Sequence, residues 1–325
     1  MVKAVRIHQH GGPEVLTYED VSLAAPGPGE VHIRNEAVGL NFLDVYYRTG
    51  LYPSPGGLPL IPGHEGAGIV LAVGFGVDDL KEGDRVAYSD PIGAYAAERL
   101  VPAERLVKVP DAIALEQAAS MMLKGMTAHY LLRQTFPVKS GDTILFHAAA
   151  GGVGLIAGQW AKHLGATVIG TAGSDAKVKL ALEHGYDHVI NYRTENFVER
   201  VKELTGGKGV QAVYDSVGKD TFDGSLDCLR PRGMIIGFGQ SSGAVPPFDL
   251  GILARKGSLY LTRPTLFTYI AGREALAKAA SELFQLVTNG TIRIQTGQTY
   301  ALKDAADAHR DLEARKTTGT TVLIP

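Results

Sequence analysis

One segment constrains the fold of this chain more than any other, the stretch GDTILFHAAAGGVG from Gly141 to Gly154. An apolar strand runs straight into a glycine cluster, and a helix-forming run begins there. This is the context that a dinucleotide-binding βα turn requires. Gly151 would let the backbone approach a pyrophosphate, and Gly154 would permit close contact between helix and sheet. Because Ala149 replaces the first glycine of the usual G-x-G-x-x-G pattern, an ordinary glycine-rich βα turn is the alternative interpretation.

The sequence around this turn repeats the same βα unit. Apolar strands are predicted at residues 143–147, 167–171, 188–191, 210–215, 233–237 and 258–262, and helices at 154–164, 176–184 and 197–205. Continuously apolar strands that alternate with helices predict a parallel sheet covered on both faces.

The first 120 residues differ in composition and are rich in glycine and proline. They hold short β-like runs at residues 2–8, 30–40, 68–73, 85–88 and 105–109, followed by a helical pattern at 116–135. Two helices, 273–289 and 305–315, and a strand at 320–324 close the chain, and we expect them to return to the first domain. The predicted class is therefore α/β, with a β-rich domain at 1–123 and 266–325 and a doubly wound Rossmann domain at 124–265.

Composition excludes several classes of function. The 325 residues carry a net charge of −2 with no basic block, so the electrostatic footprint of a nucleic-acid-binding protein is missing. The one cysteine, Cys228, excludes a disulfide framework and a cysteine-rich structural zinc lobe. No apolar run approaches the ~20 residues of a membrane helix, and the N-terminus lacks a signal-peptide pattern. We expect a soluble, cytoplasmic protein.

The tip of the second predicted strand indicates which nicotinamide cofactor would bind. NAD-specific sites place an acid there, about 20 residues beyond the glycine turn, to hold the ribose 2′-hydroxyl. Here the strand ends Thr171-Ala172-Gly173-Ser174, without an acid. Ser174 can donate to a 2′-phosphate and Lys177 can reach it, whereas Asp175 can point to solvent as a helix cap. These residues favour NADPH, with Lys177 as an ordinary solvated helix residue the alternative.

Several motifs together resemble one family over essentially the whole chain. The glycine-turn segment extends to Gln159 and Lys162 in a pattern similar to the signature of the quinone oxidoreductase/zeta-crystallin family. Gly63-His64-Glu65 resembles a turn of the wider medium-chain dehydrogenase/reductase superfamily. The segments 41–52, 214–218 and 257–264 match in order. The resemblance implies a GroES-like catalytic domain with an inserted Rossmann domain and the cofactor in the cleft between them.

The same resemblance implies which residues surround the cofactor. Asn41 and Tyr46 are expected near the nicotinamide, and the other cofactor contacts are expected at Thr127, Tyr130, Gly151, Gly152, Val153, Gly154, Gly173, Ser174, Lys177, Tyr192, Ser216, Val217, Phe238, Ser241 and Arg315. Members of the family commonly form homodimers through the last Rossmann strand, here residues 258–262.

The sequence argues against a catalytic zinc ion. Such a site needs about three protein ligands and an open fourth position. Zinc members of the superfamily take a cysteine at the position that Asn41 holds here, and an amide is a poor zinc ligand. His64 and Glu65 remain, but two adjacent residues do not make a site, and a hydrogen-bonded turn residue is the simpler interpretation of His64.

Without a metal ion, the hydride acceptor must already be electrophilic, as a quinone is. Donors that stabilise the developing hydroquinone anion are candidates for catalysis, namely Asn41, Tyr46, Tyr52 and Arg263. The tyrosines are equally well explained as pocket lining. Two other functions stay open, an NADPH-dependent alkenal or enone reductase on the same fold and a structural or RNA-binding role like that of crystallin-like relatives.

Overall fold

The structure, a computed structural model, describes all 325 residues. It divides into two compact units, the first at Met1–Met126, Ile270–Asn289 and Ile294–Pro325, the second at Thr127–Tyr269 and Gly290–Arg293. Each unit has its own sheet and its own hydrophobic core. No helix is both long enough and apolar enough to cross a membrane.

The first unit is built on a seven-stranded sheet in the order β14-β15-β3-β4-β5-β7, with β6 also paired to β3. The strands of this sheet are β3 (Glu30–Leu40), β4 (Glu65–Val73), β5 (Arg85–Tyr88), β6 (Glu98–Pro102), β7 (Val107–Lys108), β14 (Thr296–Ala301) and β15 (Thr320–Ile324). A separate two-stranded sheet pairs β1 (Val2–Arg6) with β2 (Thr17–Val21). The helices of the unit are η1 (Pro13–Val15), α1 (Phe42–Arg48), η2 (Ala103–Arg105), α9 (Arg273–Thr288), η4 (Leu302–Asp304) and α10 (Ala305–Glu313), and α2 (Leu115–Tyr130) begins in this unit.

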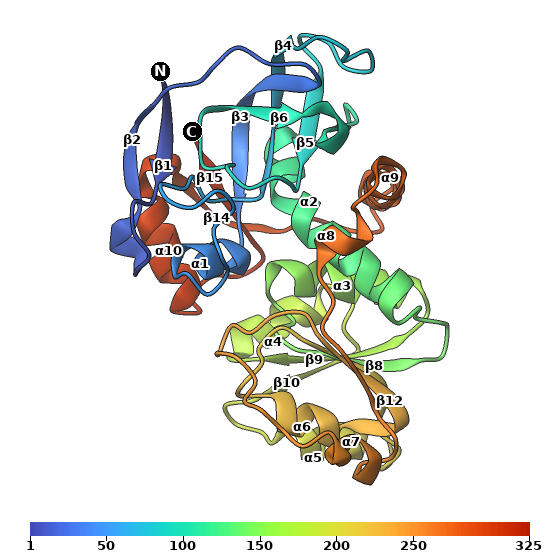
Figure 1. Ribbon diagram of the computed structural model, residues 1–325. Coiled ribbons are helices and arrows are strands. Elements are labelled where there is room, and N and C mark those ends of the chain that lie inside the picture. The colour runs from blue at the N-terminus through green and yellow to red at the C-terminus, as the bar shows by residue number, and fades with distance from the viewer. The chain divides into compact units, whose positions relative to one another are not determined.

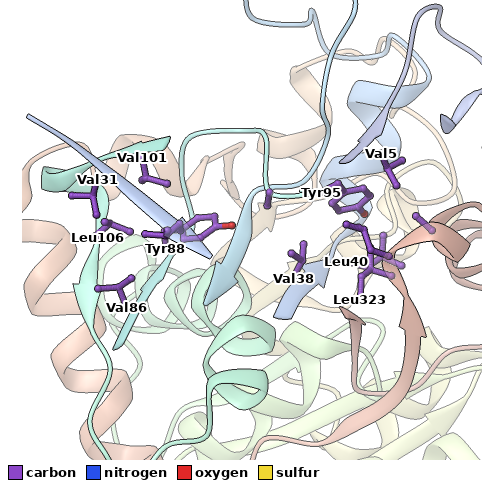
Figure 2. Packing of buried hydrophobic residues seen from close by; sticks show 14 of the residues in the cluster. Val5, Val31, Val38, Leu40, Val86, Tyr88, Tyr95, Val101, Leu106 and Leu323 are labelled. Carbon is purple, nitrogen blue, oxygen red and sulfur yellow. The ribbon is translucent and has the colours of Figure 1, made fainter. Parts of the chain in front are cut away.

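The register of this sheet places the first part of the candidate site. Strands β3 and β4 are antiparallel and pair Gly39 with Glu65, so that Asn41, which follows β3, comes close to the start of β4. Figure 2 shows the core of this unit, where Val38 and Leu40 of β3 lie beside Tyr95 and beside Leu323 of β15.

The second unit is a six-stranded parallel sheet in the order β10-β9-β8-β11-β12-β13. Its strands are β8 (Thr143–Phe146), β9 (Thr167–Ala172), β10 (His188–Asn191), β11 (Val210–Asp215), β12 (Leu229–Gly237) and β13 (Tyr260–Thr262). Its helices are η3 (Leu131–Thr135), α3 (Gly152–His163), α4 (Asp175–Leu182), α5 (Phe197–Leu204), α6 (Phe222–Asp227), α7 (Gly251–Arg255) and α8 (Leu266–Tyr269). Helices α3 and α4 cover one face, and α5, α6 and α7 cover the other (Figure 1).

The chain order of this sheet locates its ligand-binding edge. The chain runs outward from β8 to β9 and β10, and then returns to β11 on the other side of β8. In open parallel sheets, ligands bind outside the carboxyl ends of the strands at such a switch point. The turns after β8, β9 and β11 therefore form the candidate edge.

Most predicted elements are present, with local differences that have physical causes. Strand β13 begins at Tyr260 rather than at Ser258, because Ser258 has a left-handed φ of 59° and cannot be extended. The predicted helix 116–135 is α-helical to Tyr130 and continues as a π-helix over Leu131–Thr135. The predicted strand 105–109 is reduced to Val107–Lys108, after a short 3-10 helix.

Candidate functional site

The glycine turn after β8 packs closely against its own backbone at Gly154. Helix α3 begins at Gly152, with Gly151 as the N-cap residue. A Cβ atom on Gly154 would lie 2.5 Å from the carbonyl oxygen of Ala148, so only glycine fits there. At Gly151 the nearest atom to such a Cβ would be 3.2 Å away, so this glycine is less constrained by its own turn. The first N–H groups of α3 have no partner within the helix, which is the arrangement that binds phosphate.

The turn after β9 carries the residues predicted to select the cofactor. Ser174 is the N-cap of α4 and accepts a hydrogen bond from the Lys177 backbone N–H at 3.4 Å. The expectation that Asp175 caps this helix is wrong, because Ser174 occupies that position and Asn191 donates to the Asp175 carboxylate at 2.8 Å. Tyr192 covers Gly173, where a Cβ would lie 2.4 Å from the phenol oxygen.

A third group of predicted residues meets after β11 and β12. The Ser241 N–H donates to the Ser216 carbonyl at 3.1 Å, which joins two segments 25 residues apart. The Phe238 ring lies 5.6 Å from that of Phe146 in β8. Arg263 donates from Nη1 to the carbonyl of Gly237 at 3.0 Å. The second unit thus brings Ser216, Val217, Phe238, Ser241 and Arg263 to one edge of its sheet.

Thr127 and Tyr130 lie at the C-terminal end of α2. Both are nearly buried, and the Tyr130 ring stacks on Tyr269 with 4.5 Å between the centroids. Thr135 donates its hydroxyl to the phenol oxygen of the same Tyr269. Helices α2 and α8 are therefore held together by aromatic packing at this point.

In the first unit, the buried ion pair between Glu65 and Lys124 lies next to Asn41, a predicted catalytic residue. The Glu65 carboxylate is inaccessible to solvent and accepts from Asn41 Nδ2 at 2.9 Å, from the Leu123 N–H at 2.7 Å and from the Lys124 ammonium. Asn41 Nδ2 also faces the Gly39 carbonyl at 3.3 Å. Both amide hydrogens of Asn41 are therefore engaged within the protein, and its side chain also takes part in a capping box with Asp44 at the start of α1.

His64 is a hydrogen-bonded turn residue. Its Nδ1 lies 3.3 Å from Oδ1 of Asp44, and both side chains are buried. The other Asp44 oxygen accepts from the Asn41 N–H at 2.9 Å and from the Tyr95 hydroxyl at 3.0 Å. Burial raises the pKa of Tyr95 well above its usual range, so this phenol stays protonated as a donor.

Aromatic side chains gather around His64. The rings of Tyr46 and Tyr52 are 5.2 Å apart, and Tyr47 lies 5.8 Å from Tyr52 and 5.0 Å from the His64 ring. Burial raises the pKa of Tyr47. The structure thus places the predicted Tyr46 and Tyr52 together and adds Tyr47 and His64 to the same cluster.

A second buried network supports α1 from behind. The Arg48 guanidinium forms two hydrogen bonds with Glu313, at 2.8 and 2.9 Å, and donates to His309 Nδ1 at 3.0 Å. His309 Nε2 lies 2.9 Å from the Tyr95 hydroxyl, and burial lowers the pKa of His309 to about 3, so the ring is neutral. Arg315, the remaining predicted cofactor contact, follows α10 with a left-handed φ of 58°.

Two family models match the chain. Residues 27–111 match the alcohol dehydrogenase GroES-like domain, and residues 152–286 match the zinc-binding dehydrogenase domain. Together with the parallel sheet and its glycine turn, these matches define the class as the medium-chain dehydrogenases/reductases.

Similar proteins narrow the class to one family. The quinone oxidoreductase of Pseudomonas aeruginosa is 56% identical over the full length of both chains. The crystal structure of Escherichia coli quinone oxidoreductase complexed with NADPH is 52% identical, covers 99% of this chain and 100% of that one, and has a TM-score of 0.97. The 2-haloacrylate reductase of a Burkholderia species is 48% identical and covers 100% of this chain and 99% of its own length. The chain belongs to the quinone oxidoreductase family.

The zinc ion in the name of the second family model does not fit the residues present. The structure contains no group of three or more His, Cys, Asp or Glu side chains that could hold a metal ion. The Glu65 carboxylate is occupied by Lys124, and the adjacent position is the Asn41 amide. An ammonium group therefore supplies the positive charge next to Glu65.

The sequence patterns did not predict the partners that hold Glu65 and Arg48 in place. Lys124 lies 59 residues from Glu65, and His309 lies 261 residues from Arg48, so no local pattern connects them. The available signal was a charged residue within an apolar run: Lys124 interrupts Met121-Met122-Leu123, and Arg48 follows Val45-Tyr46-Tyr47. Such residues are rarely buried unless they are paired.

Proposed function

We propose that this chain reduces quinones with NADPH and without a metal ion. The observation that carries the proposal is the 52% identity and TM-score of 0.97 to a quinone oxidoreductase complexed with NADPH, over essentially the full length of both chains. The turn after β9 supports the choice of cofactor, because it holds Ser174 and Lys177 and no acid at the strand tip.

We assign the cofactor to the turns of the second unit. The glycine turn at 151–154 would hold the pyrophosphate, since its N–H groups and the helix dipole attract anions. Gly173, Ser174, Lys177 and Tyr192 would surround the adenosine 2′-phosphate. The remaining contacts would come from Ser216, Val217, Phe238, Ser241, Thr127, Tyr130, Arg315, Asn41 and Tyr46. In domain terms, residues 1–123 and 266–325 would form the catalytic domain and residues 124–265 the cofactor domain.

The protein's own groups would orient the substrate and stabilise its charge. When bound, NADPH supplies a hydride to the electron-poor quinone. Tyr46, Tyr52 and Arg263 would donate hydrogen bonds to the oxygen on which negative charge develops. Asn41 would not donate in the same way, because its amide hydrogens already face Glu65 and Gly39.

The test is NADPH and NADH oxidation measured side by side with 1,4-benzoquinone and a naphthoquinone, with and without a chelator. We expect turnover with NADPH that survives chelation. Loss of activity that added zinc restores would contradict the metal-free proposal.

A second candidate function is reduction of an activated double bond. It is favoured by the 48% identity to a 2-haloacrylate reductase. Turnover of 2-haloacrylates or 2-alkenals exceeding that of quinones would make this the main activity. NADPH binding without turnover of any of these substrates would instead support a structural role, whereas the net charge of −2 argues against RNA binding.

We also propose a homodimer formed through β13, the edge strand of the parallel sheet. Tyr260 is 57% exposed and Leu261 37% exposed, and an uncovered apolar edge strand pairs readily with another strand. The expected particle has twice the mass of the 34.5-kDa chain, and Leu261→Lys should shift it toward the monomer in light scattering. Tyr18→Lys, on the exposed strand β2, is the matched control. A monomeric parent protein would refute this arrangement.

We also propose that the protein is located in the cytoplasm. A chain with one cysteine that uses NADPH suits a reducing compartment. Activity found only in the membrane or secreted fraction of the source cells would contradict it.

A further inference from the structure

A line of buried hydrogen bonds runs under the candidate cofactor edge of the second unit. His147 follows β8, and its Nδ1 lies 2.9 Å from the hydroxyl of Thr171 in β9. Its Nε2 lies 3.0 Å from the hydroxyl of Ser225 in α6. Ser225 in turn donates to the carboxylate of Asp215, at the end of β11, at 2.9 Å. All four residues are at most 2% exposed.

The direction of each hydrogen bond in this line is fixed. The single hydroxyl hydrogen of Ser225 goes to the carboxylate, so the Ser225 oxygen accepts from the N–H on His147 Nε2. Burial lowers the pKa of His147 and keeps the ring neutral. Its Nδ1 is therefore an acceptor for the Thr171 hydroxyl. The neutral His147 ring, with its hydrogen on Nε2, therefore links Thr171 to Ser225.

Each end of the line controls a turn. Asp215 also accepts from the backbone N–H groups of Val217, at 2.8 Å, and Gly218, at 3.0 Å. These bonds fix the turn in which Ser216 and Val217 are candidate cofactor contacts. At the other end, the Thr171 carbonyl accepts from the Ala149 N–H at 2.9 Å, so the same strand tip is tied to the glycine turn.

We propose that His147 is a positioning residue that holds the three cofactor-facing turns, after β8, β9 and β11, in one arrangement. It touches no cofactor atom in this role and acts through Thr171 and through Ser225 and Asp215. The proposal rests on the proposed binding of NADPH, but not on quinone turnover. Because the turns after β8 and β11 would contact parts that NADPH and NADH share, losing the link should weaken the binding of both cofactors, and that of NADPH at least as much since the β9 turn faces its 2′-phosphate.

The test compares His147→Leu, which removes both hydrogen bonds, with His147→Gln, which keeps one donor and one acceptor. Dissociation constants for NADPH and NADH are measured by cofactor fluorescence, well below the melting temperature of each variant. We expect about tenfold weaker binding of both cofactors for the leucine variant and a change of less than about threefold for the glutamine variant. His163→Gln, at the exposed end of α3, is the control and should change neither constant.

Two further variants apply if the leucine variant does not fold. Thr171→Val and Ser225→Ala each remove one hydroxyl from the line, and each should weaken both cofactors by about threefold or more. Unchanged dissociation constants together with a lower melting temperature would show a purely structural role and overturn the proposal. Weaker binding of NADPH alone would also overturn it. A parent protein that binds NADPH but reduces no quinone would refute the proposed reaction and leave this inference standing, whereas one that binds no NADPH would refute both.

Discussion

Replacing Lys177 with alanine is expected to raise the KM for NADPH by about 10- to 100-fold and to leave that for NADH within about twofold. Lys177 lies in the first turn of α4, directly after the Ser174 cap. A 2′-phosphate placed there would meet the lysine ammonium and the positive end of the helix, whereas the 2′-hydroxyl of NADH carries no charge for either to attract. The effect should therefore depend on the phosphate alone.

The measurement is steady-state kinetics with each cofactor at saturating quinone. Lys179→Ala is the matched control, because this lysine is exposed on the same helix two residues further on. Equal increases in KM for both cofactors would mean that Lys177 does not contact the phosphate. Raising the salt concentration should reduce the difference in KM for NADPH between the parent protein and the Lys177→Ala variant, since the interaction is electrostatic.

The local parts of the candidate cofactor edge were predictable because their constraints lie within a few residues. The strands Val210–Asp215 and His188–Asn191 and the glycine turn all follow from short apolar runs that end in glycine, serine or asparagine. Strand β3 and the final strand β15 were found by the same signal. A buried parallel strand needs no information from distant sequence to be recognised as one.

Elements stabilised by distant partners were not predictable in this way. Strand β14 has the weak pattern Thr-Gly-Gln-Thr-Tyr-Ala and forms by parallel pairing with β15. Helix α1 has only seven residues, too few to be stable alone, and is fixed by Asp44 bonding back to the Asn41 N–H and by Arg48 bonding to Glu313. The cofactor expectation rests on one strand tip, whereas the hydrogen bonds around Asn41 and Glu65 depend on Lys124, far along the chain.

Replacing Lys124 with methionine is expected to lower the free energy of unfolding by about 3–5 kcal/mol. Methionine fills a similar volume but leaves the Glu65 carboxylate buried without its cation. The remaining donors, the Asn41 amide and the Leu123 N–H, cannot neutralise a charge that is fully removed from water. Urea unfolding followed by circular dichroism measures the loss.

The double variant Glu65→Gln with Lys124→Met separates the charge from the packing. If the loss comes from an unpaired carboxylate, removing that charge as well should recover most of the stability, because a neutral amide can still hydrogen-bond to Leu123. Quinone turnover by the double variant should be lower than that of the parent protein even if its stability is recovered. The reason is that the Asn41 amide would no longer be held by a carboxylate. A single Lys124→Met variant as stable as the parent would mean that the ion pair does not hold this part of the site together.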